Sequence, residues 1–180
     1  MGNLKSLTKL ALNYTKSPSL PEAIGELTSL KILDLEGNKF SSIPGTIGEL
    51  QSLRSLNLTN NQLSSLPETF FELKSLQALG LSDNQFTSIP KAIGKLTSLR
   101  DLSLRNNDLT SLPETIGNLK RLETLNLASN EIPSLPKTMM QLPSLKSLFL
   151  FNTRISSLSV MLNINKVTLI LKRRGCKVQI

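Results

Sequence analysis

Leucine recurs every 23 residues along this chain, at positions 10, 33, 56, 79, 102, 125 and 148. Around these leucines apolar and polar residues alternate, as in the segment 102–104, which predicts a short half-buried strand. Between Leu109 and Leu119 the apolar residues lie three or four apart, a spacing that favours a helical or 3₁₀ turn. Each unit is therefore predicted to be a strand, a bend and a loose helical return.

The period also predicts the domain organisation. Stacked repeats share one long core, because a single unit cannot bury its apolar edge alone. Six full copies run from residue 7 to residue 144, with partial copies on both sides, so residues 1–158 are assigned to the repeats. One elongated domain is expected.

The chain after Leu158 departs from the repeat and is interpreted as a cap of the same domain, residues 159–180. A dense apolar run is followed by a predicted helix from Asn165 to about Arg174, and Gly175 is a suitable stop. The last residues alternate like one more edge strand, in which Cys176 is expected to be a small buried apolar residue. As the only cysteine, it cannot form an internal disulfide.

Asparagine recurs at one offset, directly after each predicted strand. An apolar side chain in this bend would leave peptide groups unpaired at about 1–3 kcal/mol each. An amide both donates and accepts, so a column of amides can bind the backbone of successive bends. We therefore predict a structural ladder formed by Asn38, Asn61, Asn84, Asn107 and Asn130.

Proline and glycine mark the return segments. Prolines at 21, 44, 67, 90, 113 and 136 are expected to fix the backbone where each return begins. Glycines at 25, 48, 94 and 117 are expected in tight bends. Phe71 and Met140 occupy the same offset, which indicates that the position tolerates bulk.

Together these residues read L-x-x-L-x-L-x-x-N-x-L-x-x-L-P-x-x-I-G-x-L, and the chain resembles leucine-rich repeat proteins. The 23-residue length with Leu-Pro and Ile-Gly is similar to the Ras-group-like subclass, and especially to the short leptospiral members of the family. The resemblance implies an α/β fold: a right-handed solenoid with a parallel concave sheet, a 3₁₀ or irregular convex side and a C-terminal helix-strand cap. It also implies a protein-binding role.

Side chains between the strand leucines should point to the concave face, which is mostly small and polar. Phe149 and Phe151 depart from this pattern and are typical of an interface anchor. Either they contact a partner or the tail of the cap folds over them. The predicted partner-binding residues are Phe149, Phe151, Asn126, Ala128, Ser103 and Arg105, together with Asp34 and Glu36 at the other end.

Charge is uneven along the chain. Residues 1–131 contain thirteen basic and thirteen acidic residues, whereas residues 132–180 contain eight basic residues and no acid. A basic end can attract nucleic acid, anionic lipid or an acidic protein. A solvated cap helix that keeps this end soluble is favoured, because no aromatic residues interleave with the basic run and the segment matches no nucleic-acid motif.

Catalysis finds little support, because the chain has no histidine and its glycines are single and periodic. We expect no cofactor and no metal. The leading hypothesis is a non-catalytic protein–protein interaction module, including a bacterial host-interaction role, and the alternative is anion binding through the basic C-terminal end.

The N-terminus begins inside a repeat, with Met1 at the isoleucine position and no polar cap before the first strand. Either the chain is a fragment of a longer protein or something covers this end. Because exposed strand edges invite pairing, we expect the chain to self-associate through this end, by docking or by strand exchange. The chain has no apolar stretch of membrane-spanning length and no signal peptide. This predicts a cytoplasmic protein, or a secreted or surface-exposed one if a signal has been removed.

Overall fold

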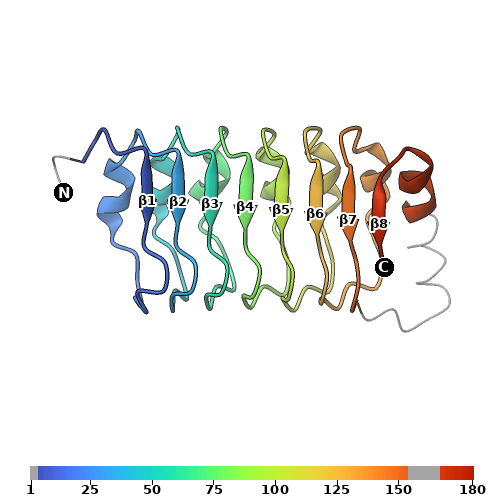
Figure 1. Ribbon diagram of the computed structural model, residues 1–180, viewed down its shortest axis with the longest axis horizontal. Coiled ribbons are helices and arrows are strands. Elements are labelled where there is room, and N and C mark those ends of the chain that lie inside the picture. The colour runs from blue at the N-terminus through green and yellow to red at the C-terminus, as the bar shows by residue number, and fades with distance from the viewer. Residues whose placement is uncertain (1–3, 154–166) are drawn as a thin grey trace.

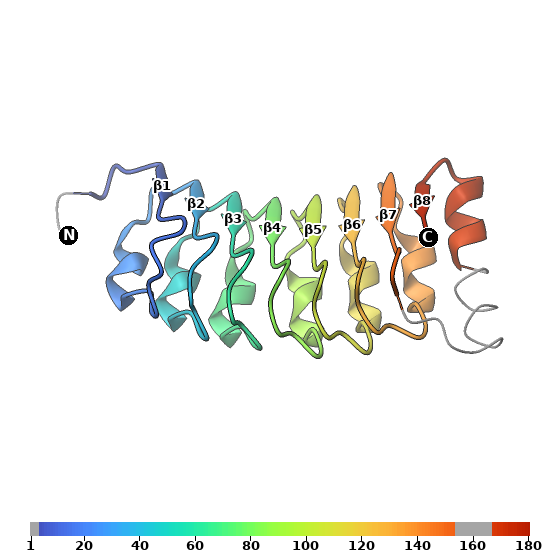
Figure 2. The ribbon, with the colours of Figure 1, turned by 60° about the horizontal axis from the view of Figure 1, so that its bottom comes forward.

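The computed structural model describes residues 4–153 and 167–180. The chain winds into a row of coils, with strands along one side and 3₁₀ helices along the other (Figure 1). Figure 2 shows the strands along the inner, gently concave edge of the stack. The predicted solenoid with a parallel sheet, a 3₁₀ convex side and a C-terminal helix and strand is confirmed.

The described strands form one parallel sheet in chain order. They are β1 (Lys9–Ala11), β2 (Ile32–Asp34), β3 (Ser55–Asn57), β4 (Ala78–Gly80), β5 (Asp101–Ser103), β6 (Thr124–Asn126), β7 (Ser147–Phe149) and β8 (Lys177–Gln179). β5 begins one residue earlier than the predicted segment 102–104, although the pairing continues beyond it: the Leu104 amide still donates to the Asn126 carbonyl oxygen at 2.8 Å. Leucines 23 residues apart lie opposite each other from β1 to β7, which stacks them into one core.

The convex side consists of 3₁₀ helices, one in each return. They are η1 (Glu22–Glu26), η2 (Gly45–Glu49), η3 (Glu68–Glu72), η4 (Lys91–Lys95), η5 (Glu114–Asn118) and η6 (Lys137–Gln141). The predicted prolines directly precede them, and at Pro113 the backbone has φ −72° and ψ 147°. An extended proline therefore begins each return, and a short 3₁₀ turn brings the chain back toward the next strand.

The bend after each strand uses a left-handed backbone conformation. Seven residues at this position have φ between 52° and 68°: Tyr14, Gly37, Asn60, Asp83, Asn106, Ser129 and Asn152. Asparagine, aspartate and glycine adopt this conformation with the least strain. The next residue in each central coil is the ladder asparagine.

Each asparagine of the ladder connects two coils. Asn84 is buried, and its Nδ2 donates to the carbonyl oxygens of Leu58, Leu81 and Ser82 at 2.9, 3.2 and 3.1 Å. Its Oδ1 accepts from the Leu63 amide of the preceding coil at 3.0 Å. Asn61, Asn107 and Asn130 repeat this set of bonds in their own coils.

The glycines of the return segments do not lie in tight bends. They lie within the 3₁₀ helices, against a threonine of the next coil: a Cβ atom on Gly94 would be 2.7 Å from the Thr115 carbonyl oxygen. That threonine hydroxyl donates back across the coils to the Lys91 carbonyl oxygen at 2.7 Å. Gly25, Gly48 and Gly117 meet Thr46, Thr69 and Thr138 in the same way.

Phe71 shows that this position does not simply tolerate bulk. Its side chain is buried, 1% exposed, and the position facing it in the next coil is Ala92 rather than threonine. Phenylalanine therefore occurs where the facing residue is smaller and lacks the hydroxyl tether. Figure 2 shows η3 and η4 further apart than the other neighbouring 3₁₀ helices.

The C-terminal end contributes a helix at residues 167–173 and the edge strand β8, which pairs with β7. Gly175 between them has φ 84°, a left-handed conformation suited to glycine. Cys176 is buried, as expected, and burial raises the pKa of its thiol. The predicted helix start at Asn165 and the apolar run before it lie outside the described residues, as does Met1.

Candidate functional site: the concave face

Three columns of side chains lie between the core leucines along the concave face. The strand register places Asn57, Gly80, Ser103, Asn126 and Phe149 side by side across β3 to β7 in the central column. A second column contains the first residue of each strand, and a third follows two residues after the strand ends. Because the strands are parallel and in register, one coil contributes one residue to each column.

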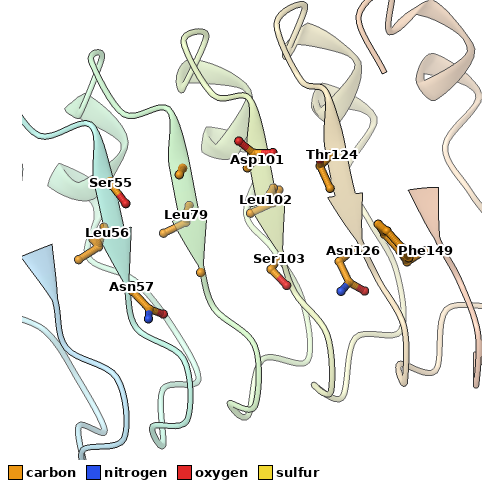
Figure 3. A pocket seen from close by; sticks show the side chains of 12 residues that line it. Ser55, Leu56, Asn57, Leu79, Asp101, Leu102, Ser103, Thr124, Asn126 and Phe149 are labelled. Carbon is orange, nitrogen blue, oxygen red and sulfur yellow. The ribbon is translucent and has the colours of Figure 1, made fainter. Parts of the chain in front are cut away.

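A shallow hollow of about 280 Å³ lies in the middle of this face (Figure 3). Small residues form its floor, with Gly80 and Ala78 on β4 and Ser103 on β5. Asn57 bounds it on one side, and Phe149 closes the other. The remaining lining residues are Ser55, Leu56, Leu79, Asp101, Leu102, Thr124 and Asn126.

Phe149 and Phe151 are both half-buried. Phe149 ends β7 and lies opposite Gln179 of β8, while its ring lines the hollow. The tail of the chain thus extends the sheet as the next strand beyond β7. The described part of the tail does not fold over the face, and the two aromatic side chains retain exposed surface.

The other predicted partner-binding residues differ in access. Ser103 and Asn126 are half-buried and line the hollow, and Arg105 is exposed beside them. The prediction that Ala128 contacts a partner is wrong, because its side chain is 0% exposed. Its methyl group lies in the column between the much longer side chains of Arg105 and Phe151, so it offers no surface to a partner.

At the N-terminal end, Asp34 and Glu36 already have partners within the chain. Asn13 donates to Asp34 at 2.8 Å, and the Glu36 amide donates to the same carboxylate at 3.3 Å. Tyr14 and Asn57 donate to the two oxygens of Glu36 at 2.5 and 3.0 Å. These carboxylates cross-link the first three coils, which leaves them less free to bind a partner than the sequence indicated.

Tyr14 provides a direct measure of this network, since it is the only tyrosine and tryptophan is absent. Its hydrogen bond to Glu36, followed by burial and the charges of Glu36 and Asp34, raises the Tyr14 pKa. An absorbance titration should therefore give a midpoint above the usual tyrosine range, and Glu36→Gln should lower it. Because the pKa is raised on folding, the stabilisation is present at neutral pH and disappears as pH rises through the folded-state pKa.

The matched control for this titration is Glu22→Gln, which removes an exposed carboxylate from η1 and should leave the midpoint where it is. The protein unfolded in urea should titrate at the ordinary tyrosine value. A folded midpoint equal to the unfolded one would show that the Tyr14–Glu36 hydrogen bond does not form in solution.

Two basic residues at the edge of the face, Arg100 and Lys146, are held by the same neighbour. Arg100 contacts Glu123 at 2.6 Å, and Lys146 contacts the other oxygen of the same carboxylate. The hydrogen bonds from Lys146 and Arg100 lower the pKa of Glu123, with the larger effect from Lys146, so the carboxylate stays charged. In the C-terminal helical turn, Arg174 donates to the Met140 carbonyl oxygen at 2.6 Å, so this cation stabilises the end of the stack.

Sequence reasoning missed some residues of the hollow. Thr124 and Ala78 begin their strands and line its upper side together with Asp101, which the sequence had already placed on the charged part of the face; Figure 3 shows Asp101 and Thr124. The register of the repeat places all three in the first-residue column, so the signal was present in the sequence. Within the described residues there is no cluster of metal-ligating side chains, and no described helix has the length and apolarity needed to span a membrane.

Comparison with known proteins agrees with this geometry. A leucine-rich repeat model matches residues 28–86 and 51–109, and a model described as a leucine-rich repeat region matches residues 90–174. None of the curated proteins compared with the chain matches it.

Three solved structures are similar. A Leptospira interrogans leucine-rich repeat protein is 32% identical over 98% of this chain, with a TM-score of 0.63. A Listeria monocytogenes internalin is 24% identical over 98% of this chain, with a TM-score of 0.77. A chain in the structure of a TLR13–ssRNA13 complex is 29% identical over 83% of this chain, with a TM-score of 0.74. The chain spans 55%, 48% and 22% of their respective lengths.

Family models thus match the chain from residue 28 to residue 174, and the coils, the ladder and the parallel sheet have the corresponding structure. This chain belongs to the leucine-rich repeat family.

Proposed function

We propose that this chain is a non-catalytic protein-binding module, and that the hollow walled by Phe149 is the centre of its binding surface. Solenoids of this kind commonly use their concave face to bind other proteins. The observation that carries the proposal is the hollow itself, a depression in the sheet next to two half-exposed aromatic rings. Binding energy at protein interfaces concentrates in such aromatic anchors.

The partner is proposed to be a protein, and the similarity to a Leptospira interrogans protein supports a bacterial source for the chain. We extend the proposal to a host protein as the partner. Self-association through β1, where Leu4 and Leu12 are exposed, stays a prediction from the sequence.

The double variant Phe149→Ala, Phe151→Ala tests the proposal. Partners are captured from host and bacterial lysates, identified and purified, and their affinities are then measured by calorimetry. We expect the double variant to bind at least about tenfold more weakly, since each truncated anchor residue costs about 1 kcal/mol or more. Leu169→Ala, which truncates an exposed apolar residue of the C-terminal helix away from the concave face, is the matched control and should bind nearly as well as the wild type.

Thermal unfolding of the same proteins separates binding from packing. Both phenylalanines are only half-buried, so the double variant should remain folded and cooperative. Unchanged affinity in a folded double variant would remove the hollow from the interface.

A further inference from the structure

The residues directly before the strands form a continuous line along one edge of the concave face. Backbone amides link them from coil to coil: Arg54 donates to Lys31, and Arg100 to Gln77, at 2.8 and 2.7 Å between N and O. Neighbouring positions are therefore about 4.8 Å apart. The line consists of Lys31, Arg54, Gln77, Arg100, Glu123 and Lys146, and its four cations are called the basic row.

The basic row has positive charge available to a partner. Lys31 and Arg54 are exposed, and neither forms an ion pair with any described residue. Arg100 and Lys146 share the carboxylate of Glu123, which leaves that group with one net positive charge. Lys9 adds another exposed cation at the start of β1.

The opposite edge of the face, where the strands end, carries net negative charge. Its acidic residues are Glu36, Asp83, Asp108 and Glu131, with Asp34 next to them in the central column, against the described cations Lys16, Lys39 and Arg105. The edge with the basic row also carries Asp101 and Glu123 but is net positive, whereas the edge where the strands end is net negative. A nucleic acid placed along it would meet the acidic edge, whereas a protein segment can carry acidic groups on one side only.

We infer that the partner of the concave face is an extended protein segment that crosses β2 to β7 with a line of acidic side chains against the basic row. The inference rests on the proposed function. In an extended segment, every second side chain points the same way, and these side chains repeat at about 6.7 Å. In the basic row, Lys31 and Arg54 are one coil apart, whereas Arg54 and Arg100 are two coils apart, roughly 10 Å. The four cations of the row lie at roughly 0, 5, 14 and 24 Å along it, and alternate side chains of the segment reach roughly 0, 7, 13 and 27 Å. The offsets of up to about 3 Å are within the reach of flexible Lys, Arg, Asp and Glu side chains, so acidic residues at alternate positions can pair along the row.

A peptide-display selection tests this without a known partner. Peptides that bind the wild-type chain are selected from a library of random twelve-residue sequences. The selected peptides are synthesised with a fluorescent label, and their affinities for the protein are measured by fluorescence anisotropy. We expect selected peptides to be rich in Asp and Glu. Lys31→Glu with Arg54→Glu should weaken their binding about tenfold or more, because two attractions become repulsions. Raised salt should reduce wild-type affinity.

The matched control is Lys16→Glu with Lys39→Glu, which changes the net charge equally on the opposite edge and should have little effect. Glu123→Gln should tighten binding, since it frees Arg100 and Lys146. Equal losses from both double variants would show a general charge effect and overturn the inference.

Two further outcomes separate this inference from the proposed function. Peptides without acidic enrichment whose binding depends on Phe149 and Phe151 would overturn the basic row as a docking site and leave the proposed function standing. A 20-nucleotide single-stranded RNA is titrated in parallel. The inference fails if the RNA binds the wild type more tightly than any selected peptide does and this binding disappears in the Lys31→Glu, Arg54→Glu variant. In that outcome the basic row binds nucleic acid.

Discussion

Asn84→Leu should lower the free energy of unfolding by about 3 kcal/mol or more, because it removes the four buried hydrogen bonds that the Asn84 side chain forms with the backbone of two coils. The Leu58 and Leu81 carbonyl oxygens and the Leu63 amide all lose a partner at a buried position. Leucine has the same branched shape and number of side-chain heavy atoms as asparagine, so no cavity forms, and its larger methyl groups add some overpacking to the loss. Urea unfolding followed by circular dichroism measures the change.

Asn118→Leu is the matched control, because it makes the same substitution on an exposed residue at the end of η5. Its effect should stay within about 0.5 kcal/mol. Asn38→Leu is expected to fall between the two, since Asn38 lies near the exposed first coil, where water can replace part of its bonding. A loss at Asn84 no larger than at Asn118 would show that the ladder does not stabilise the stack.

The regular part of the fold was predictable from the sequence because its causes repeat. The period predicted the stacked strands, and the asparagine column predicted side chains that bind backbone at each bend. The boundary of the predicted strand 102–104 was displaced by one residue, since apolar alternation identifies the buried leucine while pairing begins with the residue before it.

What the sequence did not reveal depends on contacts between coils. Glycine at the 94 position looks like a bend residue until Thr115 is placed against it. Asp34 and Glu36 look like free surface charges until Asn13, Tyr14 and Asn57 are found to bind them. Each of these contacts joins residues about one period apart, so they could have been sought by reading the sequence in register.

The concave site, too, was only partly predictable from the sequence. The aromatic pair was visible as a departure from a small polar column, but the hollow arises from five neighbouring strands together. Ala128 was misassigned because its column alone indicated exposure, whereas its access depends on the longer side chains on both sides.

Gly94→Phe should cost about 3 kcal/mol of unfolding free energy, since the new side chain must enter a space already filled by Thr115. The chain itself indicates how this loss can be reduced. At the equivalent position of the preceding coil, Phe71 faces Ala92, which has neither the threonine side chain nor its hydroxyl bond to the neighbouring coil. Adding Thr115→Ala should therefore restore about 1 kcal/mol, although Thr115→Ala alone should destabilise the protein.

The measurement is a double-mutant cycle in urea, with wild type, both single variants and the double variant unfolded under the same conditions. Removing the Thr115 hydroxyl releases the bond to Lys91, so the two coils can separate as η3 and η4 do around Phe71. A favourable coupling between the substitutions would show that the glycine–threonine contact sets the spacing of the coils. If the two losses simply add, Ala92 is not the reason that Phe71 is accommodated, and the spacing of η3 and η4 has another cause.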